Sequence, residues 1–321
     1  MLICYGCELS VAVERPTPVF CLVDVHPDRR KDIVRETPLR ASPALPQKTL
    51  HDAFGSVMQR SVLPPGETIL LLDGVIADPG LPDAREAAAR ALPVLELPAE
   101  IAVYLNGSRY CETDSLGAIA WGRFGHLAPG TEMVQSICDF THDRLSFDYK
   151  QARSTRTALE AYEEKVGVCR DFTHLAVTLC RCMNIPARYV NGYLGDIGVP
   201  PDPAPMDFNA WFEVYLDGAW FTFDARHNTR RIGRIPIARG RDACDVPMLQ
   251  TFGPHVLKTF RVVTKEVGAD PAMVRAEREF QPVPKTTNSN LTSEPPKPRR
   301  PFSAPSGKTT PPRNRRPLAS R

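Results

Sequence analysis

The stretch that decides the fold begins at Gly167-Val168-Cys169-Arg170-Asp171-Phe172. Apolar residues follow at positions i, i+3, i+4, i+7 and i+11, which is the spacing of one buried helix face. These residues are Phe172, Leu175, Ala176, Leu179 and Met183. Asn184 then suits the left-handed conformation that ends a helix. The stretch therefore predicts a buried helix with Cys169 in its first turn.

A cysteine in the first turn of a helix has two interpretations. Free backbone N–H groups and the positive end of the helix dipole favour a thiolate there, and the same N–H groups could hold an oxyanion. Alternatively, the cysteine is a small buried hydrophobic residue. The helix around Cys169 leaves both interpretations open, and the residues downstream favour the first.

A β-hairpin is predicted downstream of this helix. Residues 207–216 alternate between apolar and polar, Asp217-Gly218 is a strong signal for a two-residue turn, and residues 219–224 form the return strand. This pairing makes Asn209 the diagonal neighbour of Asp224 on one face, with Cβ atoms roughly 7–8 Å apart. A thiol, an amide and a carboxylate then resemble a triad whose base has been replaced.

Four blocks of this region resemble the core of bacterial transglutaminase-like proteins, a family that includes candidate cysteine proteases. The blocks are Gly167–Phe172, Ile185–Tyr193, Met206–Val214 and Phe223–Asn228. The resemblance covers roughly residues 100–267. It implies an α+β fold with a papain-like transglutaminase core, in which a helix bearing the cysteine packs on an antiparallel sheet. An antiparallel β-rich module often precedes this core.

The resemblance also implies roles for three catalytic-site residues of this chain. The position of Cys169 is that of the nucleophile, and the position of Asp224 is that of the orienting acid. The position of Asn209 is normally histidine. An amide cannot accept a proton near neutral pH, so Asn209 cannot act as a general base or acid. Losing that role is expected to lower the rate on the order of 10²–10⁴-fold.

Two other histidines are candidate substitutes for the missing base. His174 lies five residues after Cys169 on the helix, about 140° around it, and is expected to point elsewhere. If the return strand continues past Asp224, His227 faces the opposite side of the sheet. A bend at Ala225 would change that orientation and make His227 the better substitute.

Two functions compete on this pattern. The first is acyl transfer or hydrolysis at a glutamine or peptide amide through a thioester on Cys169, with activity impaired by Asn209. The alternative is a catalytically inactive relative that uses the cleft as a peptide- or protein-binding module. Trp211, Tyr215 and Trp220 could line a peptide groove, although packing of the hairpin explains them as well. Neither function calls for a cofactor or a metal.

Short strand-like runs and Pro or Gly turn signals fill the first hundred residues and predict an antiparallel, sandwich-like module. The expected organisation is a β-rich module at residues 1–98 and the core at 99–268. A linker at 269–281 and a disordered, basic, Pro-rich tail at 282–321 are expected to follow.

Charge is unevenly distributed along the 321 residues, whose formal net charge is +3. Residues 282–321 contain nine basic residues and one acidic residue, and therefore carry +8, which leaves −5 for the first 281. Phe302 is the only aromatic residue of the tail. Specific nucleic-acid recognition is therefore poorly supported, and a solubilising tail is the favoured interpretation.

Nine scattered cysteines indicate a reduced, intracellular protein better than a disulfide framework. Cys4 and Cys7 form a C-x-x-C pair that could be a zinc half-site or a redox pair. They lie in a strand-like segment without a second ligand pair, which favours a structural role.

The sequence shows no signal peptide and no apolar run long enough to span a membrane, so we expect a cytoplasmic protein.

Overall fold

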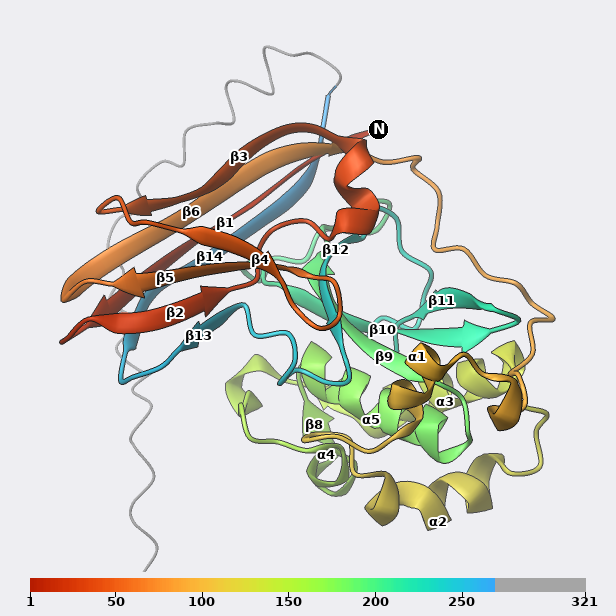
Figure 1. Ribbon diagram of the computed structural model, residues 1–321. Helices are drawn as coiled ribbons and strands as arrows, with labels where there is room; N and C mark the ends of the chain where they lie inside the picture. Colours follow the sequence, from red (N-terminus) through yellow and green to blue (C-terminus); the bar gives the residue numbers. More distant parts are fainter. Residues whose placement is uncertain (269–321) are drawn as a thin grey trace, which may run out of the picture. The chain divides into compact units, whose positions relative to one another are not determined.

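Helix α5 (Cys169–Cys182) is the element around which the C-terminal part of the fold is built. A computed structural model gives the structure of residues 1–268. Helix α5 contacts the helices α2 (Thr113–Phe124), α3 (Thr131–Arg144) and α4 (Ala158–Glu164) and the strands β9 (Ala187–Tyr193) and β10 (Asn209–Leu216) (Figure 1). Its predicted apolar face is buried, and Asn184 follows it with φ 59°. The predicted helix is confirmed.

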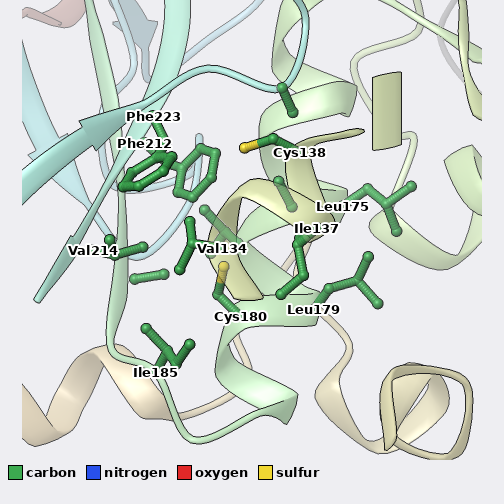
Figure 2. Close-up of a cluster of buried hydrophobic side chains, with 14 of the residues drawn as sticks. Val134, Ile137, Cys138, Leu175, Leu179, Cys180, Ile185, Phe212, Val214 and Phe223 are labelled. Atoms are coloured by element: carbon green, nitrogen blue, oxygen red, sulfur yellow. The ribbon is translucent and has the colours of Figure 1, made fainter. Parts of the chain in front are cut away.

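A hydrophobic cluster fixes α5 against its neighbours. Figure 2 shows Val134 and Ile137 of α3, Leu175 of α5, and Phe212 and Val214 of β10 meeting in it, and all five are fully buried. Burying one such side chain stabilises the fold by about 1.5–3 kcal/mol. This packing sets where the first turn of α5 lies relative to the sheet.

The sheet beside α5 is antiparallel, with the strand order β11-β10-β9-β12. Strand β11 spans Ala219–Phe223 and β12 spans Ile235–Gly240. Phe212 pairs with Phe223, as the predicted two-residue turn requires, and Asp217 and Gly218 have the positive φ values of 46° and 80°. The predicted hairpin register is confirmed.

The N-terminal part consists of two antiparallel sheets, as the sequence predicts. Their strand orders are β14-β1-β6-β3 and β13-β2-β5-β4 (Figure 1). The strands contributed by the N-terminal region are β1 (Leu2–Val13), β2 (Thr17–Cys21), β3 (Ile33–Ser42), β4 (Lys48–His51), β5 (Val57–Leu63) and β6 (Gly66–Ala77). An α+β arrangement, with β-sheets preceding a cysteine-bearing helix on an antiparallel sheet, is therefore confirmed.

Two strands late in the chain return to these N-terminal sheets. Strand β13 (Leu249–Thr251) pairs with β2, and β14 (Val256–Val267) pairs with β1 along nearly its whole length. The N-terminal sheets therefore include residues well beyond position 98. The division into modules at 1–98 and 99–268 stays a prediction.

The two parts share a hydrophobic core and buried polar contacts. Ile3 and Leu72 of the N-terminal sheets belong to one cluster with Tyr189 and Ile235 of the sheet beside α5. The Tyr193 hydroxyl crosses between the two parts and donates to the carbonyl of Val23 at 2.9 Å. Residues 1–268 accordingly lie within one compact unit.

The remaining elements are short. They are α1 (Ala99–Ala102), the parallel pair β7 (Ser146–Phe147) and β8 (Val166–Gly167), and 3₁₀ turns at Pro27–Asp32, Val94–Glu96, Val103–Leu105 and Tyr149–Gln151. Across residues 1–268 the helices lack the length and apolar character needed to cross a membrane. The linker predicted at 269–281 and the tail predicted at 282–321 lie outside the described residues.

Candidate functional site

Asp171 fixes the start of helix α5. Its Oδ2 accepts hydrogen bonds from the Val168 backbone N–H and from Arg156 Nη1, each at 3.0 Å. Gly167 leaves room for this carboxylate, because a Cβ at that position would lie 2.6 Å from the Asp171 Cβ. These contacts hold Cys169 as the first residue of the helix.

The Cys169 sulfur faces the start of strand β10. The residue is half-buried, and Sγ lies 4.0 Å from the carbonyl oxygen of Phe208. Burial chiefly, and then the Asp207 carboxylate, raise the pKa of Cys169 to about 11, while the Arg226 guanidinium and the Ala210 backbone lower it. The group is therefore a thiol at neutral pH. The position of Cys169 at the helix start therefore does not by itself lower the thiol pKa enough to give the thiolate that the sequence predicts.

Asn209 has partners for both ends of its side-chain amide. Its Nδ2 donates to the carbonyl of Leu194 at 3.4 Å and to that of Asp207 at 3.2 Å. Its Oδ1 accepts from Arg226 Nη1 at 3.2 Å. The amide therefore serves as a neutral hydrogen-bonding group at the start of β10, directly after Phe208, whose carbonyl lies beside the Cys169 sulfur.

Asp224 is buried and binds two basic side chains. Its Oδ2 accepts from Arg234 Nη2 at 2.8 Å and from His227 Nδ1 at 2.9 Å. Burial alone would raise the pKa of Asp224, but Arg234 and the hydrogen bonds from His227 outweigh burial and hold the pKa far below its ordinary value. Asp224 is a carboxylate in the folded protein at any ordinary pH.

The sequence predicts that the side chains of Asn209 and Asp224 lie close enough to meet. In the structure, Arg226 connects the two residues instead. The Arg226 backbone N–H donates to Asp224 Oδ1 at 2.9 Å, while its side chain reaches Asn209. The reason is local: β11 ends at Phe223, so Asp224 already belongs to the turn that follows and not to a strand opposite β10.

The same turn changes the orientation expected for His227. A continued strand would have pointed His227 to the opposite face, but the chain turns after Phe223, and the His227 ring pairs with the Asp224 carboxylate. The orientation expected from a straight strand is therefore wrong, and the alternative of a bend is correct. Two residue types are sequence signals for this bend. Aspartate, at position 224, favours the start of a turn, and asparagine, at position 228, tolerates the left-handed conformation that it adopts here with φ 50°.

Arg226 is a site residue that the sequence reasoning missed. Its guanidinium lies over the Phe147 ring, with Cζ 3.8 Å from the ring centroid. It also lowers the pKa values of Cys169 and Asp207. Burial nevertheless raises the pKa of Asp207 to about 6, against the opposing effects of the Phe208 backbone and Arg226. Arg226 and Asp207 both lie in blocks that resemble the family, but the resemblance assigns neither of them a role in the site.

These groups surround an open cleft beside the start of β10. The lining residues are Tyr149, Leu194, Asp196, Asp202, Ala204, Pro205, Met206, Asp207, Asn209, Arg226, His227 and Arg231. Cys169 is not one of them. Its sulfur lies next to the wall at Phe208, between the lining residues Asp207 and Asn209. The fold thus places Asn209 and His227 in the wall of one cleft, with Asp224 bonded to His227 and the Cys169 sulfur beside the Phe208 carbonyl.

The two charged neighbours of Cys169 give a pair of opposite predictions. Asp207→Asn should lower the thiol pKa from about 11, and Arg226→Gln should raise it, because they remove opposite charges from beside the sulfur. Alkylation by iodoacetamide, followed by mass spectrometry of the Cys169 peptide, should at pH 8 be roughly tenfold faster in the first variant and roughly tenfold slower in the second. If both variants changed the alkylation rate in the same direction, this placement of charges beside the sulfur would be wrong.

Other residues singled out in the sequence have structural roles. His174 is fully buried, its Nε2 accepts from the Ala243 N–H at 3.1 Å, and its ring stacks on Tyr110, so it points away from Cys169 as predicted. Trp211 is 1% exposed and lies under the Arg234 guanidinium, which is packing and not a groove wall.

The Cys4 and Cys7 pair lies within strand β1. Cys7 is buried, and its sulfur accepts from the Tyr193 hydroxyl at 3.7 Å. Residues three apart in a strand point to opposite faces. Over residues 1–268, no group of three or more His, Cys, Asp or Glu side chains has the arrangement of a metal site.

Part of the chain matches a known family model. Residues 123–225 match the family model of the transglutaminase-like superfamily, a segment that includes Cys169, Asn209 and Asp224 and ends before His227. The chain is also similar to a candidate cysteine protease from Cytophaga hutchinsonii of known crystal structure. The two are 27% identical, the TM-score is 0.72, and the match covers 84% of this chain and 92% of the other.

Mycobacterial proteins of uncharacterised function are further relatives. One from Mycobacterium leprae is 33% identical over 97 residues, which are 29% of this chain and 34% of that protein. One from Mycobacterium tuberculosis is 27% identical over 216 residues, which are 64% of this chain and 65% of that protein. The matches thus span from a third to just under two thirds of these relatives. This chain therefore carries a transglutaminase-like superfamily domain within a cysteine protease-like fold.

Proposed function

We propose that this protein is a cysteine-dependent acyl-transfer or amide-hydrolysis protein that forms a thioester on Cys169 and works slowly. The observation that carries the proposal is the placement of a half-buried cysteine at the start of a buried helix, with its sulfur facing residues 207–210 beside an open cleft. A peptide or protein amide is the substrate class that the family resemblance implies.

The slow rate follows from Asn209. An amide cannot take the thiol proton, so the position at the start of β10 supplies no base. Because burial raises the pKa of Cys169 to about 11, the thiol is almost entirely protonated at pH 7. Arg226 offsets part of this cost because its charge favours the thiolate.

A second candidate is a peptide- or protein-binding module without turnover. The contacts of Asn209 favour it. The amide binds two backbone carbonyls and the Arg226 guanidinium, and none of these partners is a carboxylate that would orient a base. The cleft would then hold a peptide while Cys169 stays protonated.

Replacement of Cys169 by alanine separates the two candidates. With p-nitrophenyl acetate as acyl donor, the native chain should form an acetyl adduct on the Cys169 peptide, and a glutamine-containing peptide should be deamidated or crosslinked slowly. Cys169→Ala should lose both signals completely, because the nucleophile is gone. Mass spectrometry of the adduct and ammonia release measure the two outcomes.

Cys244→Ala is the matched control, because Cys244 is an exposed cysteine outside the cleft. It should keep the Cys169 adduct and any turnover. If the native chain forms no adduct at Cys169 with either compound, the enzymatic proposal is wrong. Peptide binding that is equal in the native and Cys169→Ala chains would then support the binding module.

A further inference from the structure

The pairing of Asp224 with His227 has the form of a catalytic acid-base unit. His227 Nδ1 lies 2.9 Å from Asp224 Oδ2, and this carboxylate is almost completely buried. A buried carboxylate on Nδ1 fixes the tautomer that leaves the lone pair on Nε2, and it stabilises the imidazolium that proton uptake creates. The position expected to carry this ring, Asn209, is occupied by an amide.

The turn that presents His227 is held by several contacts. The backbone N–H of His227 donates to Asp224 Oδ1 at 3.0 Å, and the N–H of Asn228 donates to the Asp224 carbonyl at 2.9 Å. The Asn228 side chain bonds Gln135 at 2.9 Å and Asp139 at 2.8 Å, both on helix α3. The imidazole is therefore held in place before any ligand arrives.

His227 also opens to the cleft beside which the Cys169 sulfur lies. Its side chain is 22% exposed and lines the same cleft as Asn209 and Asp207, the residues on either side of the carbonyl that contacts the Cys169 sulfur. Arg226, the residue before it, hydrogen-bonds Asn209. With Nδ1 committed to Asp224, Nε2 is the ring nitrogen left for the cleft.

We propose that His227 is the proton acceptor for Cys169, so that the base of this site comes from the turn after β11 and not from the start of β10. This inference rests on the proposed function and names the group that performs its proton transfers. The transfer runs directly or through one water molecule in the cleft, the two routes by which a general base acts.

The chemical steps balance as follows. The Cys169 S–H proton moves to His227 Nε2, and the thiolate forms a C–S bond to the substrate carbonyl carbon. The imidazolium returns the proton to the leaving amine nitrogen as the C–N bond breaks, which leaves a thioester. A water molecule or an amine then gives a proton to Nε2 and attacks the thioester, and the departing thiolate takes that proton back.

A purely structural His227 would share the hydrogen bond but not the proton transfer, and variants distinguish the two roles. His227→Gln keeps a side-chain N–H for Asp224 but has no basic nitrogen. The rate of Cys169 acetylation by p-nitrophenyl acetate at pH 7, corrected by subtracting Cys169→Ala, should fall on the order of 10²-fold. His126→Gln removes an exposed histidine outside the cleft and should leave the rate unchanged.

The double variant Asn209→His/His227→Gln provides the decisive readout. A histidine at the start of β10 supplies a new base, so it should restore acetylation to at least the native rate if His227 acts by proton transfer. Acetylation that survives His227→Gln, or a loss that the double variant does not recover, overturns the inference alone. Failure of Cys169 to acetylate in both the native and Asn209→His chains overturns the proposed function, and the inference with it.

Discussion

In the His227→Gln chain, Asn209→His should accelerate acyl transfer to Cys169 by about 10²-fold at pH 7. The substitution puts an imidazole one residue after Phe208, whose carbonyl contacts the thiol, and general-base catalysis contributes about 10²–10⁴-fold. We expect the lower end because Asp224 is already bonded to Arg234 and cannot orient the new ring as its only partner. Pre-steady-state acetylation of the Cys169 peptide measures the gain.

Asn209→Gln is the matched control for this gain. Glutamine is about as long as histidine and keeps the amide, so it tests whether reach alone changes the rate. It should stay within a few-fold of the His227→Gln chain because it cannot accept a proton near neutral pH. If Asn209→Gln and Asn209→His accelerate the reaction equally, proton transfer at position 209 is not the limiting feature of this site.

The sequence was sufficient for those parts of the fold that rest on local periodicity. The apolar spacing from Phe172 to Met183 gave helix α5, and Asp217-Gly218 gave the hairpin and its register. Both signals depend on residues close together in the chain, where turn chemistry and helical spacing determine the outcome. Strand β14 pairs with β1, which joins residues more than 240 positions apart in the chain. No local sequence pattern predicts this pairing.

The site was predictable only up to the end of the return strand. The Cys169 sulfur lies beside the Phe208 carbonyl, and Arg226 connects Asn209 with Asp224, but the contacts of Asp224 depend on where β11 stops. Because β11 ends one residue earlier than predicted, Asp224 binds Arg234 and His227, and Arg226 reaches Asn209. Strand ends are poorly determined by propensity, whereas the buried partner of a carboxylate is determined by tertiary packing.

Asp171→Asn should lower the free energy of unfolding by about 3–5 kcal/mol. Asp171 is completely buried and Arg156 is 2% exposed, and their ion pair spans 3.0 Å. Removing one charge of a buried pair leaves the other without full compensation, which is why such variants lose several kcal/mol. The midpoint and slope of urea unfolding, followed by tryptophan fluorescence, measure the loss.

Glu164→Gln is the matched control, because Glu164 binds the same guanidinium from a half-exposed position. Arg156 Nε lies 2.9 Å from Glu164 Oε2, whose side chain is 35% exposed, so water replaces much of what the substitution removes. The expected cost is less than about 1 kcal/mol. Equal losses in the two variants would mean that Arg156 depends on both acids alike. The start of helix α5, and with it the position of Cys169, would then not be held chiefly by Asp171.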